Sequence, residues 1–300
     1  MQYRKLGKTG LETSVIGLGT DQFYGEWGQN FNQSEVDKII EKAHSFGINF
    51  IDTAECYGDH LSESFIGNAI KNRDDWIIAT KFGHKYHGFQ KQRTYHFDVK
   101  GIEEQLENSL KALKTDYIDF YQYHSPTNDD FFNKEVWEFL KQKKDEGKIH
   151  HIGIALVASA VTDGDLFQLE NAESANVDMF QIVYNRINKL AEEKVFPFCE
   201  KHNFGVLARI PLARGHLSGK YSPETNFASN DRRSFENKDD TIRQLKFVQH
   251  LKDNEVPQNV NMAQWALAWC LKNPVVSAVI PGMKNIEQVE INAKAADLEL

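Results

Sequence analysis

The stretch INFIDTAECYGDHLSE, residues 48–63, joins an apolar run to a cluster of polar side chains, and the rest of the chain is organised around it. Residues 48–51 follow a glycine, and such a short apolar run is typical of a buried strand in a parallel sheet. The run ends at Asp52, and Tyr57 follows five residues later beside a glycine. A carboxylate and a phenol are therefore expected on the loop that follows one strand. This arrangement predicts a polar site that requires a cation.

Two later apolar runs end on side chains that complement this pair. WIIAT at residues 76–80 precedes Lys81, and YIDFYQY at residues 117–123 precedes His124. An isolated buried charge costs several kcal/mol, so we expect Lys81 to pair with Asp52. Taken singly, a loop tyrosine or a hydrogen-bonded core histidine is the commoner situation. Their joint position on successive strand ends favours a site instead.

Apolar runs and helical patterns alternate along the whole chain. Strands are expected at residues 15–18, 48–51, 76–80, 117–123, 149–154, 177–183, 205–210 and 275–280. Helical patterns are expected at residues 34–46, 98–110, 136–147, 165–169, 192–202, 242–251, 262–271 and 286–296. Such alternation indicates an α/β protein, and eight units favour a (β/α)8 TIM barrel over an open doubly wound sheet.

Local signals refine this plan. Residues 2–19 alternate around Lys8-Thr9-Gly10, which predicts an N-terminal β-hairpin. Ser34 with Asp37 three residues later has the pattern of a capping box and predicts a helix start. We find no linker, repeat or low-complexity tract in the sequence, so we expect a single domain over residues 1–300.

Composition excludes several classes of protein. With 41% hydrophobic and 26% charged residues, the chain is an ordinary globular sequence, and its longest apolar stretches fall short of the roughly 20 residues that span a bilayer. The N-terminus lacks an apolar signal core, and three scattered cysteines suit a reducing compartment, so we expect a cytoplasmic protein. The net charge of -8 makes nucleic acid and anionic membrane unsuitable partners. The oligomeric state is not legible.

The other histidines and the cysteine near Tyr57 do not indicate a metal site. His150 and His151 are adjacent on an expected strand and point to opposite faces. His84 and His87 lack helical spacing and any nearby cysteine or acid set. Cys56 is interpreted as a plain loop cysteine rather than a redox-sensitive thiol. No metal is therefore expected.

Asp52, Tyr57, Lys81 and His124 together are suited to form a proton donor with a shifted pKa. A free phenol has a pKa of about 10, and a neighbouring ammonium is expected to lower the pKa of Tyr57 toward working pH. Asp52 would hold Lys81, and a neutral His124 would orient a substrate carbonyl. The set has no nucleophile and no water-activating carboxylate pair. Hydride addition to a carbonyl fits, because the alkoxide that develops must be protonated.

The sequence also resembles the aldo-keto reductase superfamily along nearly the whole chain. The matching segments are GLGT (17–20), DTAECYG (52–58), the strand ending in Lys81, DFYQYH (119–124), GKIHHIGIA (147–155), QIVYN (181–185), PLARGHLSGKY (211–221) and IPGMKNIEQVEINA (280–293). The resemblance implies an NAD(P)(H)-dependent reductase of small-molecule carbonyls with the catalytic tetrad Asp52, Tyr57, Lys81 and His124. It also implies cofactor contacts from Gly19, Thr20, Gln181, Arg209, Leu212, Arg214, Gly215, Gly282, Lys284, Gln288 and Asn292.

Two positions depart from the family pattern. Ala155-Leu156 stands where many members carry Ser-Asn for the carboxamide, so Gln181 would hold that group nearly alone. Arg209 stands where many members stack an aromatic ring on the nicotinamide, and its guanidinium plane can stack there but disfavours the oxidised, cationic ring. We expect Arg209 to favour reduction.

Further expectations concern cofactor choice, closure and an alternative role. Lys284 beside a helix start is expected to bind the 2'-phosphate, which favours NADPH, with NADH as a possible second cofactor. The polar segment 221–240 is expected to close over the bound cofactor. The alternative to an enzyme is a cofactor-bound regulatory or binding subunit, because the β subunits of potassium channels resemble these reductases. The identity of the substrate is not legible.

Overall fold

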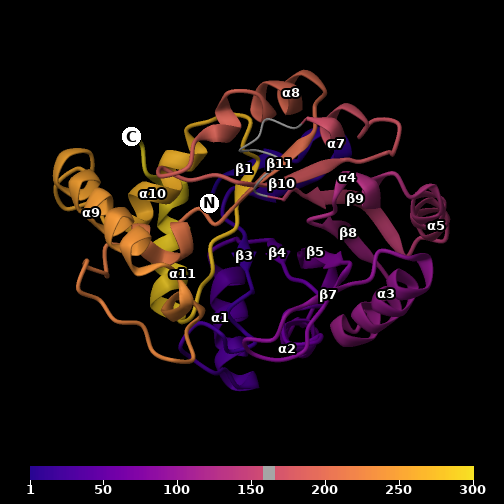
Figure 1. Ribbon diagram of the computed structural model, residues 1–300, viewed down its shortest axis with the longest axis horizontal. Helices are drawn as coiled ribbons and strands as arrows, with labels where there is room; N and C mark the ends of the chain where they lie inside the picture. Colours follow the sequence, from indigo (N-terminus) through magenta and orange to yellow (C-terminus); the bar gives the residue numbers. More distant parts are fainter. Residues whose placement is uncertain (158–165) are drawn as a thin grey trace.

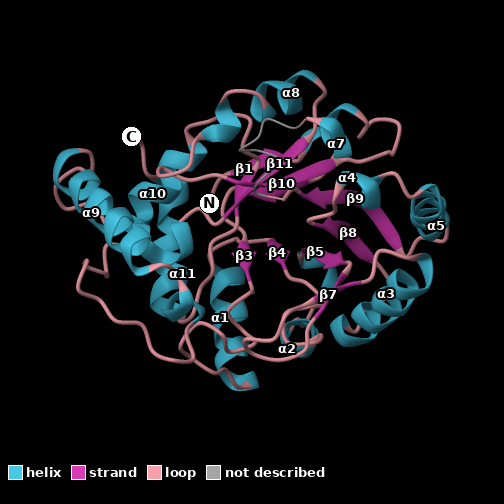
Figure 2. Cartoon of the chain, in the orientation of Figure 1, coloured by secondary structure: helices cyan, strands magenta, loops and turns pink. Residues whose placement is uncertain are grey.

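Eight parallel strands form the centre of the molecule in the computed structural model, which describes residues 1–157 and 166–300 (Figures 1 and 2). In spatial order they are β3 (Leu18–Gly19), β4 (Phe50–Asp52), β5 (Ile77–Phe82), β8 (Ile118–His124), β9 (Ile149–Ala155), β10 (Met179–Val183), β11 (Gly205–Arg209) and β12 (Ala278–Val279). Parallel bridges between Ile16 and Val279 and between Gly19 and Gly282 join the two outer strands. The sheet thus closes into the predicted barrel.

Helices surround this barrel, and most of them bury an apolar face against the strands or against neighbouring helices (Figure 2). They are α1 (Gln33–Ser45), α2 (Leu61–Ala69), α3 (Val99–Leu113), α4 (Asn128–Phe131), α5 (Lys134–Asp145), α7 (Phe167–Glu170), α8 (Val195–Lys201), α9 (Lys238–Asn254), α10 (Met262–Leu271) and α11 (Ile286–Ala293). Residue 165, the start of one expected helical pattern, lies outside the described residues. Among the described residues, no helix combines the length and apolar character needed to cross a membrane.

The predicted N-terminal hairpin covers the amino ends of the barrel strands. β1 (Tyr3–Lys5) pairs antiparallel with β2 (Glu12–Ser14). The turn between them buries Leu6 inside the barrel against residues such as Phe50 and Leu207. A Cβ atom at Gly7 would overlap the backbone of Gly205, so the hairpin approaches β11 more closely than a larger residue permits. This end of the barrel is therefore closed, and the opposite end carries the open site.

The structure corrects the predicted start of the first helix. The N-cap of α1 is Asn32, and its capping-box partner is Glu35, so the prediction at Ser34 and Asp37 was wrong by two residues. The Asn32 Oδ1 atom accepts the Glu35 amide at 3.1 Å, and the Glu35 carboxylate accepts the Asn32 amide at 2.9 Å. Asparagine is as good a cap as serine, so this pattern alone does not choose between them.

Helix α2 and a short hairpin were not predicted from the sequence. The face that α2 buries includes Ser62 and Glu63, so the segment has no apolar period to reveal a helix. β6 (His84–Lys85) and β7 (Thr94–Tyr95) pair antiparallel within what was expected to be a polar loop. Both segments lie near the carboxyl ends of β4 and β5, where they shape the site.

Candidate active site

A cavity of 580 Å³ opens at the carboxyl ends of the barrel strands. The residues predicted from the sequence converge on it from separate strands and loops. Those that line it are Gly19, Thr20, Asp52, Tyr57, His124, Gln181, Arg209, Leu212, Arg214, Gly215, Gly282, Lys284, Gln288 and Asn292. Lys81 is the predicted site residue that does not line it, because it lies behind Tyr57 with 1% of its side chain exposed.

Lys81 connects the acid and the phenol, as expected from the sequence. Its Nζ atom donates to the Asp52 Oδ2 atom at 2.7 Å, to the Thr53 carbonyl at 2.6 Å and to the Tyr57 Oη atom at 3.3 Å. These three bonds use all three protons of an ammonium group. Because Tyr57 accepts from Lys81, its own hydroxyl proton is free to point into the cavity.

The pKa of Tyr57 differs from the expectation. It is raised well above 10, first because burial disfavours a phenolate and then because Asp21 and Asp52 add negative charge. The expected lowering by Lys81 was wrong, because Asp52 at 2.7 Å balances the ammonium charge. Tyr57 therefore keeps its proton at neutral pH.

Two buried amides hold the other oxygen of Asp52. The Gln181 Nε2 atom donates to Oδ1 at 2.6 Å, and the Gln122 Nε2 atom donates to the same atom at 3.2 Å. Gln181 was expected to bind the nicotinamide carboxamide, but its amide nitrogen is directed at Asp52. Gln122, on β8, was missed because a glutamine inside an apolar run gives no distinct signal.

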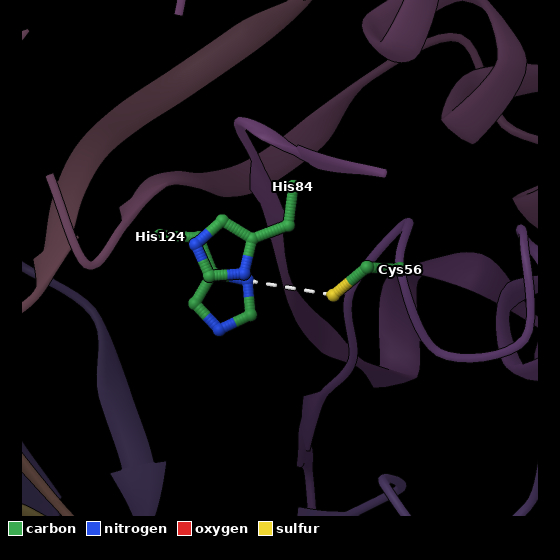
Figure 3. A group of neighbouring side chains, drawn as sticks. All are labelled: Cys56, His84 and His124. Atoms are coloured by element: carbon green, nitrogen blue, oxygen red, sulfur yellow. Dashed lines mark hydrogen bonds between the residues drawn. The ribbon is translucent and has the colours of Figure 1, made fainter. Parts of the chain in front are cut away.

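His124 lies against a second histidine and a cysteine. Figure 3 shows the His84 ring stacked on the His124 ring, with the Cys56 sulfur directed at His124. The ring centroids are 4.0 Å apart, and the sulfur is 3.6 Å from the His124 Nδ1 atom. Burial lowers the pKa of His84 to about 4 and that of His124 well below 6.5, so both rings are neutral. The expectation that no cysteine lies near His84 was wrong, because the fold brings together residues 28 positions apart.

Cys56, His84 and His124 have the residue types of a metal site but not its geometry. The ligand atoms of Cys56, His84 and His124 lie within 4.8 Å of one another, and one thiolate with two imidazoles is a donor set that suits zinc. The two rings are nearly parallel, at 12°, so the lone pairs in their planes do not converge on one point. The Arg93 Nη1 atom is also 3.1 Å from the sulfur, so a cation there would meet a positive charge.

Arg93 enters the cavity from the β6–β7 hairpin and was missed by the sequence analysis. Its Nη2 atom donates to the Tyr24 hydroxyl at 3.3 Å, and Tyr24 is stacked on Tyr57 with centroids 5.9 Å apart. The sequence of a polar loop does not show which of its side chains point into a cavity. Its position depends on the pairing of β6 with β7 and on the packing of His84 against His124.

Basic side chains gather at the other end of the cavity. Lys220, Arg233 and Lys284 line the cavity there with Arg214, and Arg232 lines it beside Asp21. The pKa of Lys284 is lowered, first by burial and then by Arg233, which shows that the two cations are close. The backbone amides of Lys284 and Gln288 donate to the side-chain oxygens of Gln288 and Asn285 at 2.9 Å each. The positive side chains therefore make the larger contribution to an anion site.

The turn after β11 is strained where it borders the cavity. Ile210, Ala213 and Arg214 have positive φ angles of 56°, 47° and 57°, and Gly215 follows at 92°. A positive φ is unusual for a β-branched residue such as Ile210, and strain of this kind clusters at ligand-binding sites. The Arg214 carbonyl accepts from the Arg233 Nη1 atom at 3.2 Å, which fixes the turn to the next segment.

The next segment, the strap (residues 221–240), crosses the cavity. Asp231 forms a β-bridge with Trp27, and the Arg232 amide donates to the Glu26 carbonyl at 3.0 Å. Tyr221, Arg232, Arg233 and Trp27 line the cavity from the two sides of this crossing. The strap thus lies over the end of the cavity where the basic side chains gather.

Comparisons with known proteins agree with this geometry. The model of the Aldo/keto reductase family matches residues 15–300. Aldo-keto reductase YhdN of Bacillus subtilis is 33% identical over 302 residues, which cover 97% of this chain and 87% of that protein. A probable voltage-gated potassium channel subunit beta of Arabidopsis thaliana is 28% identical over 311 residues, which cover 99% and 92% of the two chains.

A solved structure shares the fold. The holo form of aldo-keto reductase AKR11C1 from Bacillus halodurans is similar with a TM-score of 0.81 at 29% identity, over 100% of this chain and 92% of that one. The family model, the relatives and the closed eight-stranded barrel agree over nearly the full length of the chain. The chain therefore belongs to the aldo/keto reductase family of oxidoreductases.

Proposed function

We propose that this protein reduces an aldehyde or ketone to an alcohol with a hydride from NADPH, and that Tyr57 is the general acid. The observation that carries the proposal is the contact of Lys81 with the Tyr57 hydroxyl, 3.3 Å long, at the wall of a cavity. A protonated phenol that accepts from a buried ammonium is suited to release its proton when negative charge develops beside it.

The residues of the cavity fit a dinucleotide with several negative charges. Its volume of 580 Å³ is in the usual range for ligand sites, and its basic residues match phosphate groups. When bound, NADPH supplies the hydride that adds to the carbonyl carbon. Arg214, Arg233 and Lys284 would hold its phosphates, and Gly19, Thr20 and Arg209 would lie near its nicotinamide end.

The chain's own side chains then orient the carbonyl and supply the proton. Burial raises the pKa of the Cys56 thiol, so the thiol stays protonated and can donate to the His124 Nδ1 atom. The neutral His124 ring then carries its own proton on Nε2, which donates a hydrogen bond to the carbonyl oxygen. Tyr57 gives its proton to the alkoxide oxygen, and Lys81 stabilises the phenolate that is left.

The test of this function is consumption of NADPH in the presence of aldehydes, ketones, quinones and sugars. Steady oxidation that depends on the carbonyl compound is expected. The competing role, a cofactor-bound regulatory or binding subunit, is supported by the relative named as a potassium channel subunit beta. Tight binding of NADPH without turnover on any carbonyl compound would favour that role and contradict the proposal.

Cofactor choice gives a sharper prediction at Lys284. Lys284→Glu is expected to weaken NADPH binding by roughly 10- to 100-fold and NADH binding by about threefold or less, because charge-assisted bonds to a 2'-phosphate contribute about 1.5–3 kcal/mol. The Kd values of both cofactors, measured by fluorescence titration, provide the readout. Lys294→Glu makes the same charge change at an exposed position after α11 and should leave both values unchanged. Equal losses for the two cofactors at Lys284 would show that it does not read the 2'-phosphate.

Closure of the strap is tested by proteolysis. Glu224 is exposed in the strap, so endoproteinase Glu-C should cut there in the free protein. Saturating NADPH is expected to slow this cut several-fold, because Arg233 and Tyr221 would gain a ligand between them and the barrel. In the variant Glu224→Gln this cut should be absent, and the fragment that disappears is the one produced by cleavage at residue 224. A cut at the same rate with and without NADPH would count against closure over the cofactor.

A further inference from the structure

Among the described residues, two arginines at the reacting end of the cavity have no carboxylate within ion-pair distance, although Asp21 lines the same cavity. Arg214 pairs with Glu236 at 2.6 Å, and Arg233 pairs with Asp231 at 2.6 Å. Within residues 1–157 and 166–300, by contrast, no carboxylate oxygen lies within 4.0 Å of the Arg93 or Arg209 guanidinium. Arg209 belongs to the set expected at the nicotinamide, whereas Arg93 has no role in the reduction proposed above.

The groups that Arg93 contacts are neutral and weak acceptors. Its Nη1 atom faces the Cys56 sulfur at 3.1 Å, and its Nη2 atom faces the Tyr24 hydroxyl at 3.3 Å. Burial raises the pKa of both the Cys56 thiol and the Tyr24 phenol, so neither carries a negative charge at neutral pH. A guanidinium has five N–H donors and is always charged, so most of its capacity is free. A partly buried charge in this state favours an incoming anion.

The position of Arg93 relates it to the carbonyl. The Cys56 sulfur lies between Arg93 and the His124 imidazole, at 3.1 Å from one and 3.6 Å from the other. Arg93, His124 and Tyr57 line the same cavity. A substrate whose carbonyl oxygen meets Tyr57 and His124 would therefore bring a nearby substituent to Arg93. The planar guanidinium can bind the two oxygens of a carboxylate or a phosphate in parallel.

We propose that Arg93 is a specificity-determining residue that binds an anionic substituent of the substrate. The preferred substrates of the reductase proposed above, on which this inference rests, are then aldehydes or ketones that carry a carboxylate or a phosphate a few bonds from the carbonyl. The same contacts explain why the neighbouring Cys56, His84 and His124 do not favour a cation, since Arg93 supplies a positive charge at the sulfur.

The test compares pairs of aldehydes that differ in the anionic group alone. Glyoxylate is compared with acetaldehyde, succinate semialdehyde with butanal, and glycolaldehyde phosphate with glycolaldehyde, each by NADPH oxidation. The wild-type protein is expected to prefer the anionic member of at least one pair by roughly 10- to 100-fold in kcat/KM. The pair with the largest ratio of kcat/KM values shows whether a carboxylate or a phosphate is preferred. It also shows how many bonds separate the preferred anion from the carbonyl.

Variants assign the preference to Arg93. Arg93→Met keeps the aliphatic stem and is expected to remove most of the preference, because KM for the anionic substrate rises by much more than any change in the activity on its neutral partner. That neutral activity also shows that the variant is folded. Arg93→Lys should keep part of the preference. Lys91→Met removes an exposed charge from the same hairpin and should keep all of it.

The outcomes separate this inference from the proposed function. Turnover of neutral and anionic aldehydes at similar kcat/KM in the wild-type protein would overturn the role of Arg93 and leave the reductase function intact. An anion preference that survives in Arg93→Met, or that is lost equally in Lys91→Met, would overturn it as well. A wild-type protein that oxidises NADPH neither with these aldehydes nor with any ketone, quinone or sugar would overturn the reductase function itself.

Discussion

Tyr57→Phe is expected to lower kcat by about 100- to 10,000-fold, because it removes the proton donor and keeps the aromatic ring. The ring packs on Tyr24 and meets His124 edge to face, and these contacts are preserved in the variant. The Kd for NADPH should therefore change by about twofold or less. Steady-state rates and fluorescence titration of the cofactor measure the two quantities on the same preparation.

Tyr117→Phe is the matched control for this variant. Tyr117 precedes β8 at the opposite end of the barrel, where its hydroxyl donates to Asp74 at 3.4 Å. Loss of that surface hydroxyl should leave kcat unchanged. If Tyr57→Phe keeps a kcat comparable to the wild-type value, another group protonates the alkoxide, and the assignment of Tyr57 as the acid is wrong.

Lys81→Met should cost both activity and stability. The ammonium is the closest cation to Asp52, whose side chain is only 5% exposed, and loss of one partner of a buried ion pair typically costs about 3–5 kcal/mol. The Tyr57 phenolate would also lose its hydrogen-bond donor, so turnover should fall to a level similar to that of Tyr57→Phe. Urea unfolding monitored by tryptophan fluorescence measures the free energy of unfolding.

The double variant Lys81→Met with Asp52→Asn separates these two effects. A neutral amide no longer needs a cation, and its oxygen can still accept from Gln122 and Gln181, so most of the lost stability should return. Activity should not return, because Lys81 is still absent. A Lys81→Met protein as stable as the wild type would contradict a strong buried ion pair, and an active double variant would exclude Lys81 from catalysis.

The sequence by itself determined the barrel and the position of the cavity. Apolar runs of strand length that alternate with helical patterns leave few topologies in which every run is buried. In a closed parallel barrel all carboxyl ends of the strands meet at one face, so Asp52, Lys81 and His124 had to come together once the strands were recognised. The residues expected to hold the cofactor were recognised through family resemblance, and the structure places them around the same cavity.

Only the tertiary structure decided the electrostatics and the wall of the substrate end. The pKa of Tyr57 depends on how fully Asp52 balances Lys81 and on how much protein surrounds the phenol, and neither quantity is visible in a motif. Cys56 and His84 meet His124, and Arg93 meets Cys56, although tens of residues separate these positions in the chain. Strand periodicity is a local property, whereas burial and the pairing of charges are sums over contacts distant in the sequence, so they appear only after the chain has folded.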